Sequence, residues 1–149
     1  MLAQKSEKWI VELLWEIGIP MHVHGYHYLL EAVHLTLSRN ETNLSLSQHL
    51  YPNIAMHHHT SAASVERSIR HAIEMAWKRG NLSAVAGLFG RSVNLTYEKP
   101  TNSEMIALLT EKIRMRIYEE EEALASTNTH TDNESTAERL PYYHYSDIK

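Results

Sequence analysis

The side chains of this sequence that best fit a chemical task lie between positions 60 and 81. Five polar or charged residues recur there at steps of three and four, so a helix would place them on one face. Apolar residues at the same spacing would form a buried stripe on the other side. A helix buried on one side that offers hydrogen-bonding side chains on the other suits the reading of base edges in a DNA major groove. The exposed face would comprise Ser64, Arg67, His71, Glu74 and Lys78, with Glu66 and Arg70 beside it.

A shorter apolar segment directly precedes this stretch and indicates a helix-turn-helix. Residues 52–58 form a second helical pattern, in which Pro52 fits the first turn because its missing N–H costs nothing there. Ala55 is small enough to let the following helix pack closely, and Thr60 or Ser61 can cap that helix. The pattern by itself leaves open an ordinary buried helix with a solvated charged face, since many helical proteins contain short helix pairs.

Helical periodicity covers most of the remaining chain. No segment alternates apolar and polar residues as a half-buried strand would, so we predict an all-α fold. The end of the chain is rich in Thr, Asn, Ser and Asp and too poor in apolar side chains to offset the entropy of ordering. We therefore expect a helical domain over residues 1–122 and a disordered acidic C-terminal tail over residues 123–149. The other predicted helices span residues 7–17, 26–39, 44–50, 82–89 and 105–117.

Charge is unevenly distributed along the 149 residues. The net charge is −4, but residues 1–118 carry twelve Lys/Arg against ten Glu, a balance of +2, whereas residues 119–149 carry two against eight, a balance of −6. A body at +2 permits phosphate contact without requiring it. The sequence has no cysteine, no apolar run of about eighteen residues for a membrane span and no apolar signal-peptide core. These absences predict a cytoplasmic protein without a membrane partner.

Several separate stretches, in the same order, resemble one family. Residues 65–81, VERSIRHAIEMAWKRGN, resemble the recognition helix of the C-terminal effector domain of the stage-zero sporulation response regulator, the master sporulation transcription factor of endospore-forming bacteria. The resemblance covers roughly residues 9–118. The further matching stretches are EIGIPMH (16–22), GYHYLLEA (25–32), LYPNIA (50–55), GLFG (87–90) and KPTNSEMIA (99–107).

The resemblance implies a six-helix domain that contains a helix-turn-helix and binds double-stranded DNA. Such a domain recognises a short asymmetric box, often as tandem copies, and contacts the sigma subunit of RNA polymerase. Glu66 and Arg67 match base-reading positions, where Arg67 would bind guanine O6 and N7 and Glu66 would accept from cytosine N4. Arg70 and His71 match neighbouring positions that reach bases or phosphates. The expected DNA-binding set is completed by Ser61, Ser64 and Lys78, and Phe89 and Val93 match the surface that meets the sigma subunit.

The sequence departs from the family pattern in ways that lower its positive charge. Ser64 stands where the family usually has Arg, His58 stands in place of Phe, and His24 and His57 stand in place of Lys. Each lost phosphate contact flattens the salt dependence of DNA binding by about one unit of slope. The family protein also carries a receiver domain, which we do not find ahead of these residues.

The eleven histidines raise the question of a metal site. His57, His58 and His59 are adjacent, but consecutive residues on a helix point about 100° apart, so three of them cannot face one ion. No cysteine and no HExxH spacing is present, and we expect no metal. We hypothesise instead that the histidines charge as pH falls toward about 6 and strengthen DNA binding there.

The four glutamates at residues 119–122 admit two interpretations. They can be a solvated helix end that pairs with Arg114 and Arg116, or part of an acidic tail that competes with DNA for the basic face.

The function that we predict is sequence-specific DNA binding in transcription regulation, with no cofactor. No nucleophile–base pair and no carboxylate pair with a supporting motif appears, so we expect no enzyme. A second class of function stays open: a protein-interaction module or antagonist with the same fold and weak DNA binding. Ser64, the low net charge and the acidic tail favour this alternative.

Overall fold

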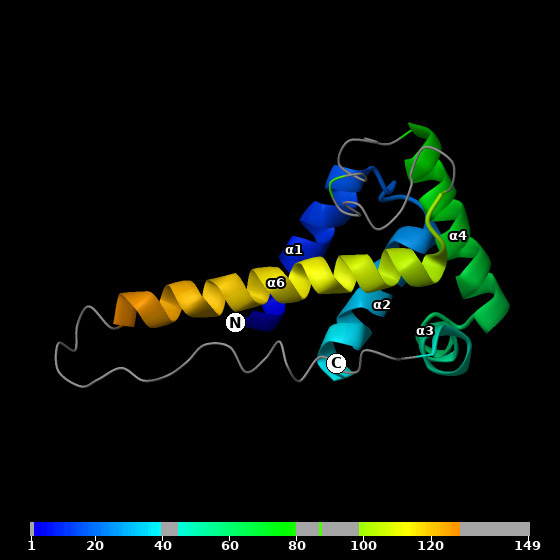
Figure 1. The fold of residues 1–149 in the computed structure, drawn as a ribbon. Coiled ribbons are helices and arrows are strands. Elements are labelled where there is room, and N and C mark those ends of the chain that lie inside the picture. Colours follow the sequence, from blue (N-terminus) through cyan, green and yellow to red (C-terminus); the bar gives the residue numbers. More distant parts are fainter. Residues whose placement is uncertain (1, 40–44, 80–86, 88–98, 129–149) are drawn as a thin grey trace.

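The computed structural model describes residues 2–39, 45–79, 87 and 99–128 (Figure 1). Within these residues the chain forms five α-helices, one π-helical turn and no strand, which confirms the all-α class. The short helix predicted over residues 82–89 lies outside the described residues apart from Gly87. The elements are α1 (Leu2–Ile17), α2 (His24–Arg39), η1 (Leu46–Leu50), α3 (Tyr51–His57), α4 (Ala62–Arg79) and α6 (Asn102–Asn128).

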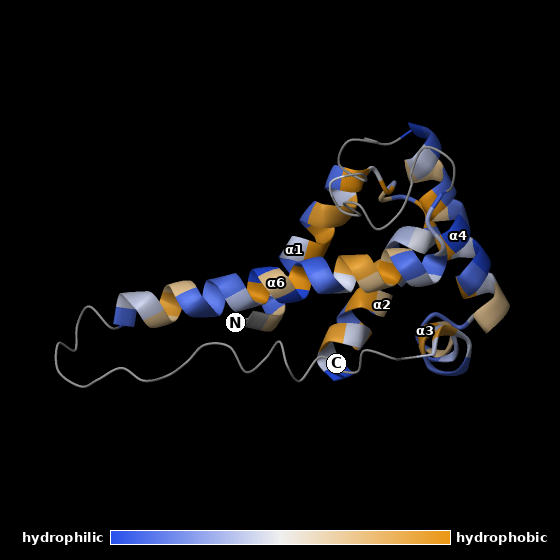
Figure 2. Cartoon of the chain, in the orientation of Figure 1, coloured by the Kyte–Doolittle hydropathy of each residue, from blue (hydrophilic) through white to orange (hydrophobic). Residues whose placement is uncertain are grey.

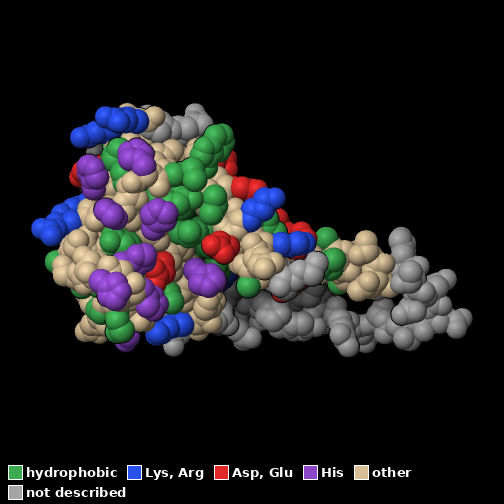
Figure 3. All heavy atoms as spheres, turned by 180° about the vertical axis from the view of Figure 1, so that it is seen from behind, with side chains coloured by type: hydrophobic (Ala, Val, Ile, Leu, Met, Phe, Trp, Pro, Cys, Tyr) green, Lys and Arg blue, Asp and Glu red, His purple; other side chains and the backbone are tan. Residues whose placement is uncertain are grey.

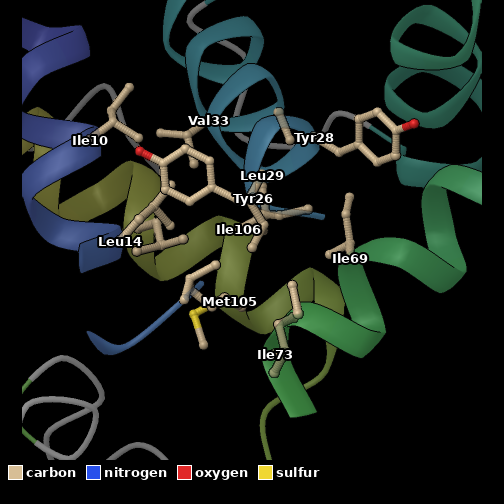
Figure 4. Close-up of a cluster of buried hydrophobic side chains, with 14 of the residues drawn as sticks. Ile10, Leu14, Tyr26, Tyr28, Leu29, Val33, Ile69, Ile73, Met105 and Ile106 are labelled. Atoms are coloured by element: carbon tan, nitrogen blue, oxygen red, sulfur yellow. The ribbon is translucent and has the colours of Figure 1, made fainter. Parts of the chain in front are cut away.

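Four helices, α1, α2, α4 and α6, surround an apolar core (Figure 4). Helix α2 contacts each of the other three, and α3 packs against α4 and η1. The apolar stripe predicted for the long helix is confirmed, and Figure 2 shows apolar surface on the inner side of α4 and hydrophilic residues on its outer side. The buried residues of α4 are Val65, Ile69, Ala72, Ile73 and Ala76.

Glycine at position 25 allows α2 to approach α4 closely. A Cβ atom built on Gly25 would lie 2.1 Å from the carbonyl oxygen of Ser68 and 2.7 Å from the Cβ of Ala72. Real Cβ atoms essentially never approach a backbone oxygen so closely, so any larger residue would force the two helices apart. This crossing sets the depth at which α4 sits in the core.

Helix α6 is longer at both ends than the sequence pattern indicated. Thr101 caps it, because its Oγ1 accepts from the Glu104 amide at 3.1 Å while the Glu104 carboxylate accepts from the Thr101 amide at 3.3 Å. At the other end, residues 123–128 are helical, although we expected the tail to begin at 123. Extending a helix that is already packed costs little free energy when the added residues are Glu, Ala and Leu. The hydroxyl of Ser126 also donates to the Glu122 carbonyl oxygen at 2.9 Å. Residues 129–149 lie outside the described part of the chain.

Contacts with α1 hold the middle of α6. Lys5 donates to Glu120 at 2.8 Å, Arg116 lies 3.4 Å from Glu12, and the Arg116 guanidinium stacks 4.8 Å from the centroid of the Trp9 ring. These partners explain why α1 begins five residues before the predicted helix at residue 7. Among the described helices, none combines the length and apolar character that crossing a bilayer requires.

Candidate nucleic-acid interface

The turn between α3 and α4 has a defined hydrogen-bond pattern. The Thr60 amide donates to the Ala55 carbonyl at 3.0 Å, and His59 between them has a positive φ of 52°. This is the Schellman arrangement, in which a residue in the left-handed conformation ends a helix and satisfies its last carbonyls. Ala55 is buried, in agreement with the close packing predicted for it, and its carbonyl oxygen also accepts the hydrogen bond that forms the turn. The turn fixes the direction in which α4 starts.

Ser61 caps the start of α4. Its Oγ accepts from the Ser64 amide at 3.1 Å, and its carbonyl accepts from the Val65 amide at 3.0 Å. The hydroxyl proton of Ser61 is not used by this cap, so the same side chain can donate to a phosphate oxygen. The expected contact of Ser61 with DNA is therefore compatible with its structural role.

The outer face of α4 carries most of the side chains that the sequence singled out. Arg67, Arg70, His71 and Lys78 are exposed, as is Ser61 ahead of the helix, whereas Ser64 and Glu66 are half-buried. Beyond its first turn, Figure 2 shows this side of α4 as mostly hydrophilic. Residues 61–79 hold four Arg or Lys against two Glu, a local balance of +2.

The charged residues of α4 differ in their partners. Arg70 forms an ion pair with Glu66 at 3.1 Å, so these two side chains restrain each other. Arg67 and Lys78 form no ion pair within the described residues. Within the described residues, Arg67 therefore keeps its guanidinium donors available, whereas the Glu66 carboxylate is engaged by Arg70.

Glu74 points toward the start of α6. It accepts a hydrogen bond from Lys99, and this bond lowers the pKa of the Glu74 carboxyl, with Lys78 and His71 acting in the same direction. The carboxylate thus stays charged, and Lys99 offsets its charge at the edge of the outer face of α4.

A groove of about 330 Å³, open to solvent, lies beside α4 and is lined by residues of α3, α4 and the start of α6. At its edge Asn102 donates to the Tyr51 hydroxyl at 3.0 Å and to the Glu66 carbonyl at 3.1 Å. Burial raises the pKa of Tyr51, and the hydrogen bond from Asn102 opposes that shift. Sequence reasoning did not assign a role to Asn102, although it lies in the matching stretch KPTNSEMIA.

The adjacent histidines at the end of α3 converge on one carboxylate. His57 bonds to one oxygen of Glu31, and His58 bonds to the other at 2.6 Å. They do not point apart as they would inside a helix, because α3 ends at His57 and His58 adopts a non-helical conformation. Glu31, on α2, was not identified from the sequence. In the described part of the chain, no group of three or more His, Asp or Glu side chains could hold a metal ion.

Histidines gather on one face of the molecule, beside α4. Figure 3 shows several of them close together between Lys and Arg side chains. The hypothesis of stronger DNA binding toward pH 6 stays a prediction. The exposed histidines of the described chain are His22, His24, His27, His34, His49, His57, His58, His59 and His71.

The sequence also predicted a sigma-contact surface and an acidic competitor of DNA. Phe89 and Val93, expected to meet the sigma subunit, lie outside the described residues. The acidic residues 119–122 lie on α6, which starts against α4 and runs away from it (Figure 1). A rise of about 1.5 Å per residue puts Glu119 roughly 25 Å along the helix from Asn102. The acidic run of α6 is therefore held away from the face that it was suggested to cover.

A capped second helix, fixed by a tight turn and exposing Arg67 and Arg70 on its outer side, has the arrangement of a helix-turn-helix. The sequence comparison agrees. Residues 10–113 match the family model described as "Sporulation initiation factor Spo0A C terminal". Because the match covers more than two thirds of the 149 residues, the chain belongs to this family. It is a DNA-binding effector domain of transcription regulation in sporulation, and not an enzyme.

Proposed function

We propose that this chain binds a specific double-stranded DNA box by inserting the first half of α4 into the major groove. Arg67 pairs with guanine O6 and N7, Glu66 accepts from cytosine N4, and Arg70 and His71 reach neighbouring bases or phosphates. Ser61, Ser64 and Lys78 contact the backbone on either side. The observation that carries the proposal is Arg67, which is exposed and forms no ion pair with any described residue, on a helix whose opposite side is buried.

The wider setting of this function follows the family. We propose that residues 82–89 supply a sixth helix, that Phe89 and Val93 contact the RNA polymerase sigma subunit, and that two copies bind in tandem. The protein would act in the cytoplasm, where the polymerase and its promoters are. Loss of sigma binding in a Val93→Ala variant that still binds DNA would support the assignment of this surface.

Selection from a randomised duplex pool tests the DNA-binding proposal directly. The full chain should enrich one box, and its affinity for that box should fall steeply with salt, since phosphate contacts release counterions. A mutated base pair in the box should cost about 1–3 kcal/mol. Failure to enrich any box at about 50 mM salt, where electrostatics helps most, would contradict the proposal.

Two observations favour the antagonist as a second candidate. The position of a groove-reaching arginine is taken by the half-buried Ser64, and Arg70 is neutralised by Glu66 at 3.1 Å. Both reduce the charge available to phosphates. An antagonist would bind the sigma subunit or a homologous regulator. In the DNA-selection assay it would enrich no box, and its residual DNA binding would depend only weakly on salt.

A further inference from the structure

The start of α6 is joined to α4 at two points along one side. Asn102 donates to the Glu66 carbonyl at 3.1 Å, and Lys99 donates to the Glu74 carboxylate. Glu66 and Glu74 are about two helical turns apart on α4. These two contacts lie on one side of α4, next to its exposed face, and together they oppose rotation of α4 about its own axis.

The Asn102 contact falls within the segment proposed to read bases. A carbonyl inside a helix already accepts from the amide four residues later, and its second lone pair is usually left to water. At Glu66 the Asn102 amide takes that place. Because the bond holds the backbone between Glu66 and Arg67, it constrains where both side chains begin.

The same amide also holds the other helix of the motif. Its second bond, at 3.0 Å, goes to the hydroxyl of Tyr51, the buried first residue of α3. One half-buried side chain of α6 therefore connects both helices of the helix-turn-helix. Base recognition requires that side chains be held within about 0.5 Å and 10–20° of their productive geometry, so such a connection affects discrimination.

Formation of α6 does not depend on this side chain. Thr101 and Glu104 cap the helix through reciprocal bonds, and Asn102 follows as the first helical residue with its side chain turned to other elements. Capping and bridging are thus performed by neighbouring but different residues, which makes them separable by mutation.

We propose that Asn102 is a positioning residue for sequence discrimination, which sets the orientation of α4 without touching DNA. This inference rests on the proposed function and adds a determinant outside the helix-turn-helix. It distinguishes residues that contact DNA from one that acts through the Glu66 carbonyl.

The test uses the full chain and two duplexes of equal length, the box selected by the wild-type protein and a scrambled sequence. Asn102→Ala removes both hydrogen bonds and should weaken binding to the box about five- to tenfold, chiefly because the bond to the Glu66 carbonyl is lost. Affinity for the scrambled duplex and the salt slope should not change, because no phosphate contact is removed. Tyr51→Phe, which leaves the bond to Glu66, should lose less.

Two further variants separate positioning from stability. Thr101→Ala removes the cap of α6 and should lower stability while keeping the ratio between the two duplexes. Asn102→Asp keeps the size of the side chain and places a negative charge in the first turn of α6, which favours the helix. However, a carboxylate oxygen then faces the Glu66 carbonyl oxygen, so the hydrogen bond is lost. This variant should lose discrimination without losing stability. After correction for any change in global stability, hydrogen exchange of the α4 amides should rise in both Asn102 variants and not in Thr101→Ala.

The outcomes are distinct. Wild-type-like discrimination and exchange in Asn102→Ala and Asn102→Asp would overturn this inference while leaving the proposed function intact. An equal loss of discrimination in Thr101→Ala would also overturn it, since the effect would then be general loosening of α6. If the wild-type chain selects no box, the proposed function fails first, and the inference fails with it.

Discussion

At the scale of single residues, the DNA-reading face depends on which charges are already paired. Glu66 and Arg70 hold each other at 3.1 Å, and Glu74 is held by Lys99. Arg67 has no such partner within the described residues and points outward. Arg67 is therefore available without breaking an ion pair within the described residues, and we expect it to contribute most to the proposed specificity.

Replacing Arg67 by Ala should cost about 1–3 kcal/mol on the selected box, because a bidentate pair with guanine is lost. The variant should lose discrimination at one base pair, so that replacing this base pair no longer changes its affinity. Quantitative binding to the box and to its single-base variants measures this. Arg79→Ala, which removes an equal charge from the far end of α4, is the matched control; the same loss in both variants would mean that Arg67 acts only through its charge.

Restoring a cation at position 64 should strengthen binding. Ser64→Arg adds a donor at the leading end of α4 and should steepen the salt slope by about one unit. Ser64→Met has similar length without charge and should leave the slope unchanged. A titration between low and physiological salt compares them, and an unaltered slope in Ser64→Arg would show that this position does not reach a phosphate.

At the scale of elements, the position of α4 is set by what packs against its buried side. Its depth comes from the crossing with α2 at Gly25 and its starting direction from the turn at His59, and we propose that the start of α6 sets its rotation. The helix-turn-helix is therefore not an independent unit, and substitutions in α2 at this crossing should change the position of α4 and, with it, the proposed DNA binding.

Adding one methyl group at the α2–α4 crossing should be costly. Gly25→Ala places a Cβ 2.1 Å from the Ser68 carbonyl, and overpacking of this kind destabilises by about 1–3 kcal/mol. Urea unfolding should show the loss as a lower midpoint. Gly87→Ala is a suitable control, because a Cβ there meets nothing within 4 Å; equal stability of the two variants would contradict the close crossing.

The turn before α4 stores some strain at a non-glycine residue. His59 has a φ of 52°, and the left-handed conformation costs an L-residue about 1–2 kcal/mol. His59→Gly relieves that cost, partly offset by the larger entropy of glycine in the unfolded chain. Thermal unfolding should show a stabilisation of up to about 1 kcal/mol, and a clear destabilisation would argue against the observed turn.

At the scale of the whole molecule, charge is separated along α6. The helix starts between α3 and α4 and extends past the other helices, carrying its glutamates away from the DNA-reading face (Figure 1). The separation exceeds the Debye length of about 8 Å at physiological salt. Any acidic competition with DNA must therefore come from residues 129–149, and not from residues 119–122.

Replacing the four glutamates at residues 119–122 by Gln should change DNA affinity by less than about twofold at physiological salt, because screening removes their effect over this distance. Deletion of residues 129–149, which keeps α6 whole, is the comparison. Binding to the selected box measures both, and a marked tightening in the Gln variant would show that the acidic run of α6 does approach the DNA.

Much of the fold was predictable because short-range sequence patterns determine where these helices begin and end. Helices α2, α3 and α4 begin and end within two residues of the predicted ranges, since apolar periodicity, Pro52 and Ser61 act within one or two turns. The ends of α6 were misjudged because a capping box at Thr101 and contacts with α1 extend it beyond its apolar stripe.

The sequence by itself determined the all-α class, the amphipathic character of α4 and, through helical spacing, which side chains lie on its outer face. Only the tertiary structure decided which of those side chains are paired and what holds the helix in place. Glu31 meets His57, Gly25 meets Ser68, and Asn102 meets Glu66. Each of these pairs joins residues far apart in the chain, and their contact depends on how whole helices cross, which a local pattern of residues does not encode.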